Sequence, residues 1–205
     1  ARAQLPTYDP AGIEVAAAST ISPNGSVLAG THGLSLLSLA ASSPIGFDAL
    51  DRNWDVYEKV SAEHGRVADR RTWRLVSPMF LAETRADAER AVSRRIGAIA
   101  AYVNRQMGVD PDWAQTPASI IDYWRTESLG EFGQAIIGTP DEAITQIERL
   151  IEKTGGFGTL LVLHVDMANW EDTKRSYELF ASEVVPHFRN RNAGRKASLQ
   201  FAEDR

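Results

Sequence analysis

The chain has 205 residues, of which 43% are hydrophobic and 24% are charged, a composition typical of a globular domain. A formal net charge of −5 argues against a nucleic acid partner, and the absence of cysteine excludes disulfides, thiolate nucleophiles and cysteine-based metal sites. No apolar run approaches the roughly 18 residues of a transmembrane helix, and residues 1–6 lack the apolar segment of a signal peptide. We therefore expect a cytoplasmic protein that binds no membrane and, from the spacing of its His, Asp and Glu residues, no metal.

The first predicted element is a short apolar strand over residues 13–19, which leads through a turn into a short helix. The turn contains Ser22, Asn24, Gly25 and Ser26. A helix that starts in such a turn offers unpaired N–H groups, small hydroxyls and a positive dipole end, which are the parts of a phosphate site. The same residue types are common in turns that bind nothing, and the residues alone favour that interpretation.

Three further strands are predicted over residues 34–39, 73–81 and 159–165. Like the first, they are nearly continuous apolar runs, which is the pattern of strands buried on both faces of a parallel sheet. Ser19 ends the first strand and His164 lies near the end of the last. The Ser19 hydroxyl either faces a ligand or caps the next turn, and the His164 imidazole either contacts a ligand or bonds to nearby backbone.

Helices are predicted between these strands. One covers residues 47–60 and stops at Gly65, where a glycine suits a helix end. A second begins at Thr84, which is spaced from Asp87 as in a capping box, and it continues as one helix to Ile99.

A third predicted helix has the clearest start in the chain. Thr139 suits the N-cap, Pro140 the first helical position and Glu142 the acid of a capping box, and residues 155–156 are glycines that end the helix. A last helix starts near Asn169. Its expected apolar face consists of Trp170, Tyr177, Phe180, Val184 and Phe188.

Residues 108–138 interrupt the alternation of strands and helices. They are too apolar for a disordered linker, and we interpret them as an insertion with one or two short helices. Residues 189–205 are polar and basic and form a predicted tail. The remaining order, over residues 1–188, gives four βα units, which is half of a (β/α)8 barrel of the TIM type. A doubly wound four-stranded sheet is the competing α/β architecture.

Several motifs resemble the luciferase-like flavin-dependent monooxygenases, and in particular the limonene-monooxygenase-like branch. The resemblance covers roughly residues 13–188 and keeps the order of the motifs. The segments that carry it are 22–25 with 29–34, 64–66 with 73–76, 137–143 and 170–180.

The resemblance implies a (β/α)8 TIM-barrel fold of which this chain supplies the last four βα units, that is, the C-terminal half. It implies reduced FMN or FAD delivered by a separate flavin reductase, reaction with O2, a small apolar organic substrate and a homodimer. The family's first four strands, most groups that pack on the flavin ring and a catalytic His have no counterpart here, so the catalytic residues stay unknown.

The resemblance also shifts the interpretation of the turn. Ser22, Asn24, Gly25 and Ser26 match the family's phosphate-binding turn, and we add Ser19 to the expected cofactor-binding residues. If a barrel forms, His164 faces its catalytic mouth, and we expect it to bind substrate.

Two other functions stay open at this point. The chain could serve a deazaflavin (F420)-dependent oxidoreductase of the same fold, because the same phosphate turn suits that cofactor. It could also be a non-catalytic half-barrel that dimerises to cover its apolar edges.

Overall fold

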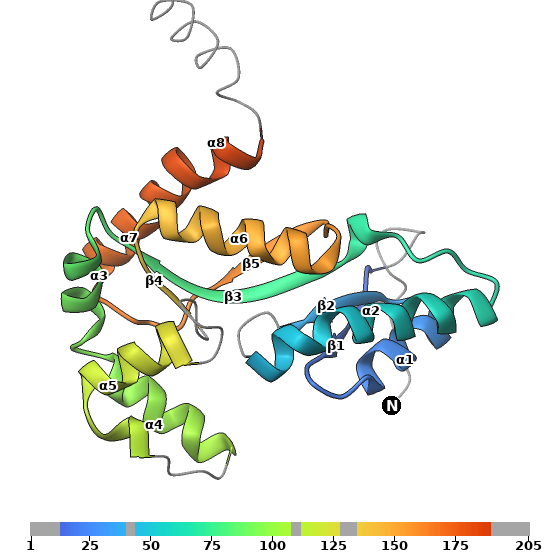
Figure 1. Cartoon of the computed structure of the whole chain (residues 1–205), viewed down its shortest axis with the longest axis horizontal. Helices are drawn as coiled ribbons and strands as arrows, with labels where there is room; N and C mark the ends of the chain where they lie inside the picture. The colour runs from blue at the N-terminus through green and yellow to red at the C-terminus, as the bar shows by residue number, and fades with distance from the viewer. Residues whose placement is uncertain (1–12, 40–43, 108–111, 128–134, 190–205) are drawn as a thin grey trace, which may run out of the picture.

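The computed structural model describes residues 13–39, 44–107, 112–127 and 135–189. These residues form a five-stranded parallel sheet with helices at both ends (Figure 1). Two helices accompany the first two strands, whereas most of the others gather around the C-terminal end of the long central strand. The strands are β1 (Ala16–Ser19), β2 (Ser35–Ser38), β3 (Arg74–Leu81), β4 (Ile136–Gly138) and β5 (Thr159–Leu163).

The strand β3 pairs with three of the other four strands of the sheet. Its N-terminal part pairs with β2 at Leu37↔Arg74 and with β5 at Arg74↔Thr159, and its C-terminal part pairs with β4 at Leu81↔Gly138. The strand β1 pairs only with β2. Because β1, β2, β3 and β5 lie side by side in chain order, the sheet lacks the reversal of strand order that defines a doubly wound fold.

All four predicted strands are confirmed, each within three residues at either end. The prediction missed β4, which has only three residues, fewer than the four to eight that an apolar run needs to indicate a strand.

The first two helices pack on the N-terminal strands. The first, α1 (Asn24–His32), ends at Gly33, which has a left-handed φ of 67°. It begins inside the predicted turn, so Asn24, Gly25 and Ser26 form its first turn. The second helix, α2 (Pro44–Glu63), buries Leu50 and Trp54 against β2 and β3 in a core cluster.

The single helix predicted from Thr84 to Ile99 is wrong: two helices occupy this segment. The first is α3 (Arg85–Val92), where Thr84 accepts a hydrogen bond from the Asp87 N–H as expected, and the second is α4 (Ile96–Met107). Between them the Ser93 hydroxyl donates to the Arg90 carbonyl and the Arg95 N–H donates to the Val92 carbonyl, which tightens the chain into a turn. The turn lets both helices bury apolar residues in one cluster.

Short helical segments fill the described part of residues 108–138. They are η3 (Asp112–Gln115), α5 (Pro117–Asp122) and the π-helical η4 (Tyr123–Glu127). Ile120, Ile121 and Trp124 are buried against Val92 and Ile96. Residues 108–111 and 128–134 lie outside the described residues, as does the predicted tail beyond Arg189.

The helix α6 (Pro140–Thr154) has the predicted capping box between Thr139 and Glu142 and ends at Gly155, whose φ is 66°. It is followed by β5 and then by α7 (Trp170–Leu179), η5 (Phe180–Val184) and α8 (Val185–Phe188).

The expected apolar face of the last helix is wrong in part. Trp170 is 72% exposed, and Tyr177 and Phe188 are exposed as well. The helix instead turns Thr173 and Ser176 inward, because the Ser176 hydroxyl accepts a hydrogen bond of 2.8 Å from the backbone N–H of Leu81 at the end of β3. The need to satisfy a buried N–H group thus outweighs the burial of an aromatic ring.

Apolar side chains remain exposed along two of the strands. Val15, directly before β1, is 52% exposed, and Leu161 and Leu163 of β5 are 40% and 43% exposed. Among the described strands, β1 and β5 each have a single partner. Such unpaired apolar edges are what two open ends of a barrel would present.

Candidate functional site

Most of the predicted cofactor-binding residues lie close together in the turn between β1 and α1. Ser19 and Ser26 are buried, and the Ser26 hydroxyl lies 3.5 Å from the Ser19 hydroxyl. The Ser19 hydroxyl donates to the Ser22 carbonyl at 3.2 Å, and the Asn24 N–H donates to the Ser22 hydroxyl at 3.3 Å. The hydroxyls of Ser19 and Ser26 therefore hold the turn, whereas the side chains of Ser22 and Asn24 are exposed.

The start of α1 leaves two backbone donors open. Pro23 precedes the helix and provides no side-chain cap, and the Val27 N–H already donates to the Pro23 carbonyl. Within the described part of the chain, the N–H groups of Gly25 and Ser26 have no acceptor. Two free donors at the positive end of a helix dipole suit an anion such as a phosphate group.

Gly25 is required for this arrangement. A Cβ atom at this position would lie 2.0 Å from the carbonyl oxygen of Ala18 and 3.0 Å from the Cα of Ser19. Glycine therefore allows the first turn of α1 to lie directly against β1, which fixes the direction of the free N–H groups.

Two residues of α2, which lie 31 to 34 positions after their partners in the chain, donate hydrogen bonds to the turn. Asn53 is fully buried, and its side-chain amide donates to the Ser19 hydroxyl at 3.0 Å and to the Thr20 carbonyl at 2.7 Å. The Arg52 guanidinium donates to the Ile21 carbonyl at 2.8 Å.

Neither residue is among the site residues predicted from the sequence. A signal existed for Asn53, because it lies three residues after Leu50 and next to Trp54, on the buried face of the helix. A polar residue on such a face must find a hydrogen-bond partner.

His164 follows β5 directly and its side chain is exposed. Its ring centroid lies 6.3 Å from that of Tyr177, and among the described residues its ring nitrogens have no hydrogen-bond partner, so the alternative of a backbone-bonded histidine is not observed. Two residues later, Asp166 has a left-handed φ of 51° and pairs with Arg95. No hydrogen bond or ion pair among the described residues connects His164 with the β1–α1 turn.

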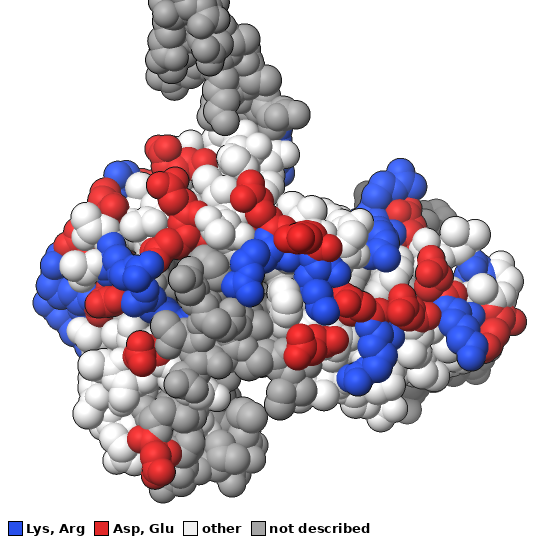
Figure 2. Space-filling view, in the orientation of Figure 1, with Lys and Arg blue, Asp and Glu red and all other residues white. Residues whose placement is uncertain are grey.

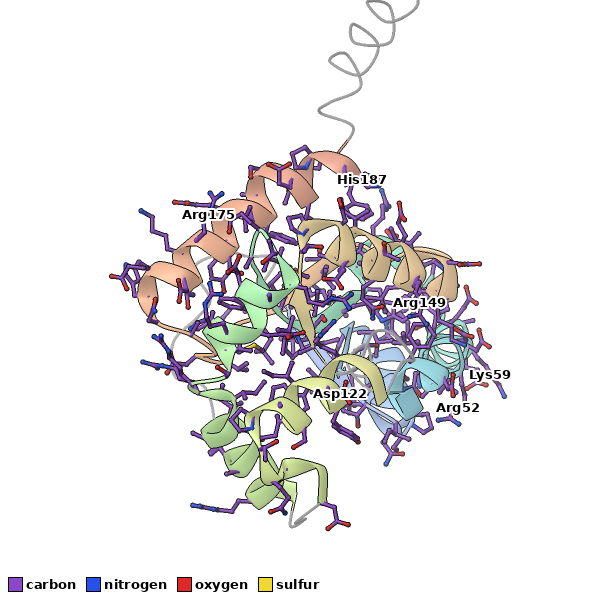
Figure 3. All side chains as sticks on the ribbon, turned by 60° about the vertical axis from the view of Figure 1, so that its left-hand side comes forward. Arg52, Lys59, Asp122, Arg149, Arg175 and His187 are labelled. Carbon is purple, nitrogen blue, oxygen red and sulfur yellow. The ribbon has the colours of Figure 1, made fainter. Side chains whose placement is uncertain are left out.

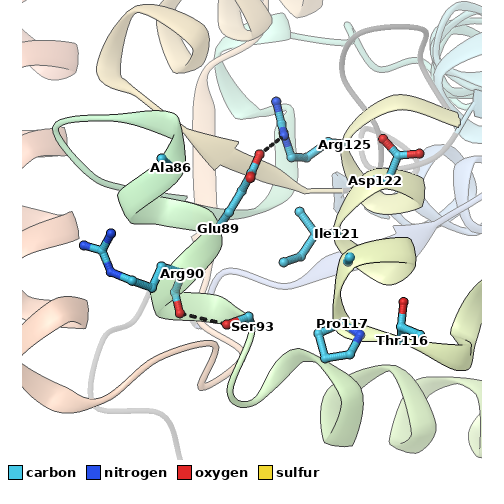
Figure 4. Close-up of a pocket in the computed structure, with 10 residues that line it drawn as sticks. Ala86, Glu89, Arg90, Ser93, Thr116, Pro117, Ile121, Asp122 and Arg125 are labelled. Carbon is cyan, nitrogen blue, oxygen red and sulfur yellow. Dashed lines mark hydrogen bonds and ion pairs between the residues drawn. The ribbon is translucent and has the colours of Figure 1, made fainter.

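A pocket of about 600 Å³ lies between α3 on one side and α5 with η4 on the other (Figure 4). This volume is in the range of small-molecule sites. Figure 4 shows Glu89 of α3 and Arg125 of η4 paired across one end of the pocket. Its other lining residues are Ala86, Arg90, Ser93, Thr116, Pro117, Ala118, Ile121 and Asp122.

The Glu89–Arg125 pair belongs to a larger charged network. The Arg125 side chain is only 13% exposed, and its second nitrogen lies 3.9 Å from the Glu142 carboxylate, which also pairs with Arg85. At the other side of α3, hydrogen bonds from the Thr84 hydroxyl and the Arg90 guanidinium lower the pKa of Asp87. The network thus ties η4 and α3 to the start of α6.

Charges elsewhere on the surface are mixed. On the face drawn in Figure 2, Lys and Arg are interspersed with Asp and Glu over most of the surface, unlike the continuous basic surface of a nucleic-acid-binding protein. No helix within the described ranges is long and apolar enough to cross a bilayer. No three His, Asp or Glu side chains of the described residues are grouped closely enough to hold a metal ion.

No family model matches this chain, but it is similar to several known monooxygenases. Over 178 residues the chain is 40% identical to limonene 1,2-monooxygenase of Rhodococcus erythropolis, a match that covers 86% of this chain and 44% of that protein. Among solved structures, the oxygenating constituent of 3,6-diketocamphane monooxygenase from Pseudomonas putida, in complex with FMN, is 26% identical with a TM-score of 0.59. That match covers 84% of this chain and 48% of the other.

A second structure shows how general the fold is. The coenzyme F420-dependent tetrahydromethanopterin reductase of Methanopyrus kandleri has a TM-score of 0.57 at 20% identity, with 86% of this chain and 51% of that chain covered. This chain therefore spans about half the length of each of the three proteins. The expected fold class is confirmed as α/β of the (β/α)8 TIM-barrel type, of which the chain supplies about half. On the likeness to the monooxygenases, the chain belongs to the luciferase-like flavin-dependent monooxygenase family.

Proposed function

We propose that the chain carries the cofactor-phosphate subsite of a luciferase-like monooxygenase that uses reduced FMN or FAD and O2 to oxygenate a small apolar substrate. The observation that carries this proposal is the pair of free N–H groups at Gly25 and Ser26, held at the start of α1 by a buried hydrogen-bond network. FMN is the favoured cofactor because it ends in a phosphate dianion, which such a helix start prefers.

The residues of the turn fit this group in distinct roles. The N–H groups of Gly25 and Ser26 and the exposed Ser22 hydroxyl would donate to the phosphate oxygens, and the Asn24 amide is placed to add a further donor. Ser19 and the Ser26 hydroxyl keep these donors in place. The bound reduced flavin would supply the electrons for the reduction of O2, while the turn binds and orients the cofactor.

His164 is proposed to bind substrate. It follows a barrel strand at the carboxyl end, where TIM-barrel enzymes have their active sites, and its ring nitrogens have no other partner in the described part of the chain. An imidazole in that position would bond to a polar group on an otherwise apolar substrate. The exposed Leu161 and Leu163 supply apolar surface on the same strand.

The partners and the domain organisation are also proposals. We propose a separate flavin reductase as the source of reduced cofactor, a homodimer, a cytoplasmic location and a barrel completed by four further βα units, which would cover the exposed edges of β1 and β5. Residues 1–188 would form one half of the barrel with an insertion at 108–138, and residues 189–205 a polar tail.

A titration of the intact protein with FMN, followed by flavin fluorescence, tests the proposal. Ser22→Ala should weaken FMN binding about tenfold, since it removes one hydrogen bond to a charged group. Ser182→Ala, an exposed serine on η5, is the matched control and should leave the affinity unchanged. Unaltered FMN affinity in Ser22→Ala would contradict the placement of the subsite.

The same protein distinguishes the alternatives. O2 consumption with reduced FMN or FAD and an apolar substrate supports the monooxygenase. Hydride transfer with F420, with no O2 consumption, would contradict the monooxygenase proposal and support the deazaflavin oxidoreductase. A tight dimer that binds neither cofactor would contradict both enzyme proposals and support the non-catalytic half-barrel.

A further inference from the structure

The first half of the β1–α1 turn has every carbonyl engaged by a side-chain donor. The Thr20 carbonyl accepts from Asn53, the Ile21 carbonyl from Arg52 and the Ser22 carbonyl from Ser19, at 2.7, 2.8 and 3.2 Å. A carbonyl oxygen that pointed at a phosphate would repel it. With these three oxygens bound to other groups, the backbone groups that remain open at the start of α1 are the N–H donors of Gly25 and Ser26.

The two α2 residues that bind the turn are anchored in the core. Asn53 is fully buried between Leu50 and Trp54, which are themselves buried in the cluster beneath β2 and β3. The two helices also lie in close contact, because a Cβ at Gly30 of α1 would come within 2.9 Å of Val60 of α2. The turn is therefore positioned by the packed core in addition to its own local bonds.

Arg52 is bound to a backbone carbonyl rather than to an acid. Its guanidinium bonds to the Ile21 carbonyl and has no carboxylate partner within the described ranges. Figure 3 shows it at the surface of α2, on the same helix as Lys59. An arginine without a paired acid adds a positive charge to the turn, next to the positive end of the α1 dipole. The arginines that do have an acidic partner are Arg71, Arg74, Arg85, Arg90, Arg95, Arg125 and Arg175.

We propose that Arg52 and Asn53 are positioning residues that preset the turn for a phosphate group and make the site select phosphorylated over unphosphorylated flavin. Asn53 fixes the backbone through Thr20 and Ser19, while Arg52 fixes Ile21 and contributes charge. This inference rests on the proposed function, because it concerns the same subsite.

The test compares FMN with riboflavin, which lacks the phosphate, on the intact protein. Arg52→Gln keeps a donor for Ile21 but removes the charge, and it should weaken FMN binding about three- to tenfold, with a smaller effect at high salt. Asn53→Ala should weaken FMN binding about tenfold or more, because it leaves buried acceptors without a donor. Riboflavin affinity should stay within about twofold in both variants. Lys59→Gln, which makes the same charge change two turns along α2, should alter neither affinity.

The possible outcomes distinguish a failure of this inference from a failure of the proposed function. If the unaltered protein binds no flavin, the proposed function is wrong and the inference falls with it. If FMN binds but Arg52→Gln resembles Lys59→Gln, or if both variants weaken riboflavin as much as FMN, then the two residues do not position the phosphate. Because Arg52 is exposed, its variants test the inference even if Asn53→Ala fails to fold, and Arg52→Lys should recover part of the FMN affinity.

Discussion

Two regions of the molecule, the β1–α1 turn and the segment around η4, are held by different forces. The β1–α1 turn is held by buried, mostly neutral hydrogen bonds through Ser19 and Asn53. The segment around η4 is held by the buried Trp124 and by ion pairs, in which Arg125 joins Glu89 and Glu142. The first kind of contact depends on shape and burial, the second on charge.

The difference explains what each region can do. Neutral buried bonds depend little on salt and pH, so they suit a turn that must present the same donors under all conditions. Ion pairs that are partly exposed contribute less and are screened by salt. The η4 segment is therefore the part whose attachment varies with ionic strength, and it forms one wall of the 600 Å³ pocket.

The largest effect should come from filling the space beside β1. Gly25→Ala places a Cβ 2.0 Å from the Ala18 carbonyl, and backbone atoms on both sides cannot give way easily. We expect a loss of about 3 kcal/mol in the free energy of unfolding, the upper part of the range for overpacking, together with loss of FMN binding. Gly97→Ala is the control, because a Cβ there meets nothing within 4 Å inside α4, and it should stabilise by about 0.5–1 kcal/mol. Equal effects of the two variants on urea unfolding would contradict this account of the turn.

A smaller effect is expected from the charged region. Arg125→Met removes a largely buried guanidinium and leaves Glu89 and Glu142 without it, so we expect a loss of about 1–2 kcal/mol at low salt. Arg71→Met removes an arginine whose side chain is 89% exposed, and it should change stability by less than about 0.5 kcal/mol. Unfolding at low and at high salt checks the mechanism: the effect of Arg125→Met should shrink as salt rises. If it does not, Arg125 acts through packing rather than through charge.

Much of the fold was predictable because its signals are local. Apolar runs placed four strands, and Thr139 and Asn169 marked helix starts that the structure has at the same residues. Where a tertiary contact decided the outcome, the prediction failed. The turn at Ser93 divides a helix whose periodicity continues across it, and the bond from Leu81 to Ser176 turns the last helix away from its aromatic face.

The same distinction between local signals and tertiary contacts applies to the candidate site. The turn with Ser22, Asn24 and Gly25 was expected as the candidate site because it matches the phosphate-binding turn of the family that the chain resembles, whereas the residue types alone favour an ordinary turn. Arg52 and Asn53 were not, since nothing in the sequence links them to a turn some 30 residues earlier. The pocket beside η4 was missed because its charged residues fit an ordinary solvated helix face equally well.

The smallest effect concerns pH and the edge strand that carries the turn. Glu14 lies two residues before β1, and its carboxylate accepts hydrogen bonds from Arg74 of β3 and Ser35 of β2. These hydrogen bonds lower the pKa of Glu14. A carboxyl whose pKa is lower in the folded than in the unfolded state stabilises the fold above its unfolded pKa, near 4.3. This contribution is lost as the pH falls through the lower, folded-state value. Glu14→Gln should therefore be slightly less stable than the unaltered chain at pH 7, and the difference should disappear at acidic pH. A difference in urea midpoint that persists in acid would show that Glu14 supports β1 through shape rather than charge.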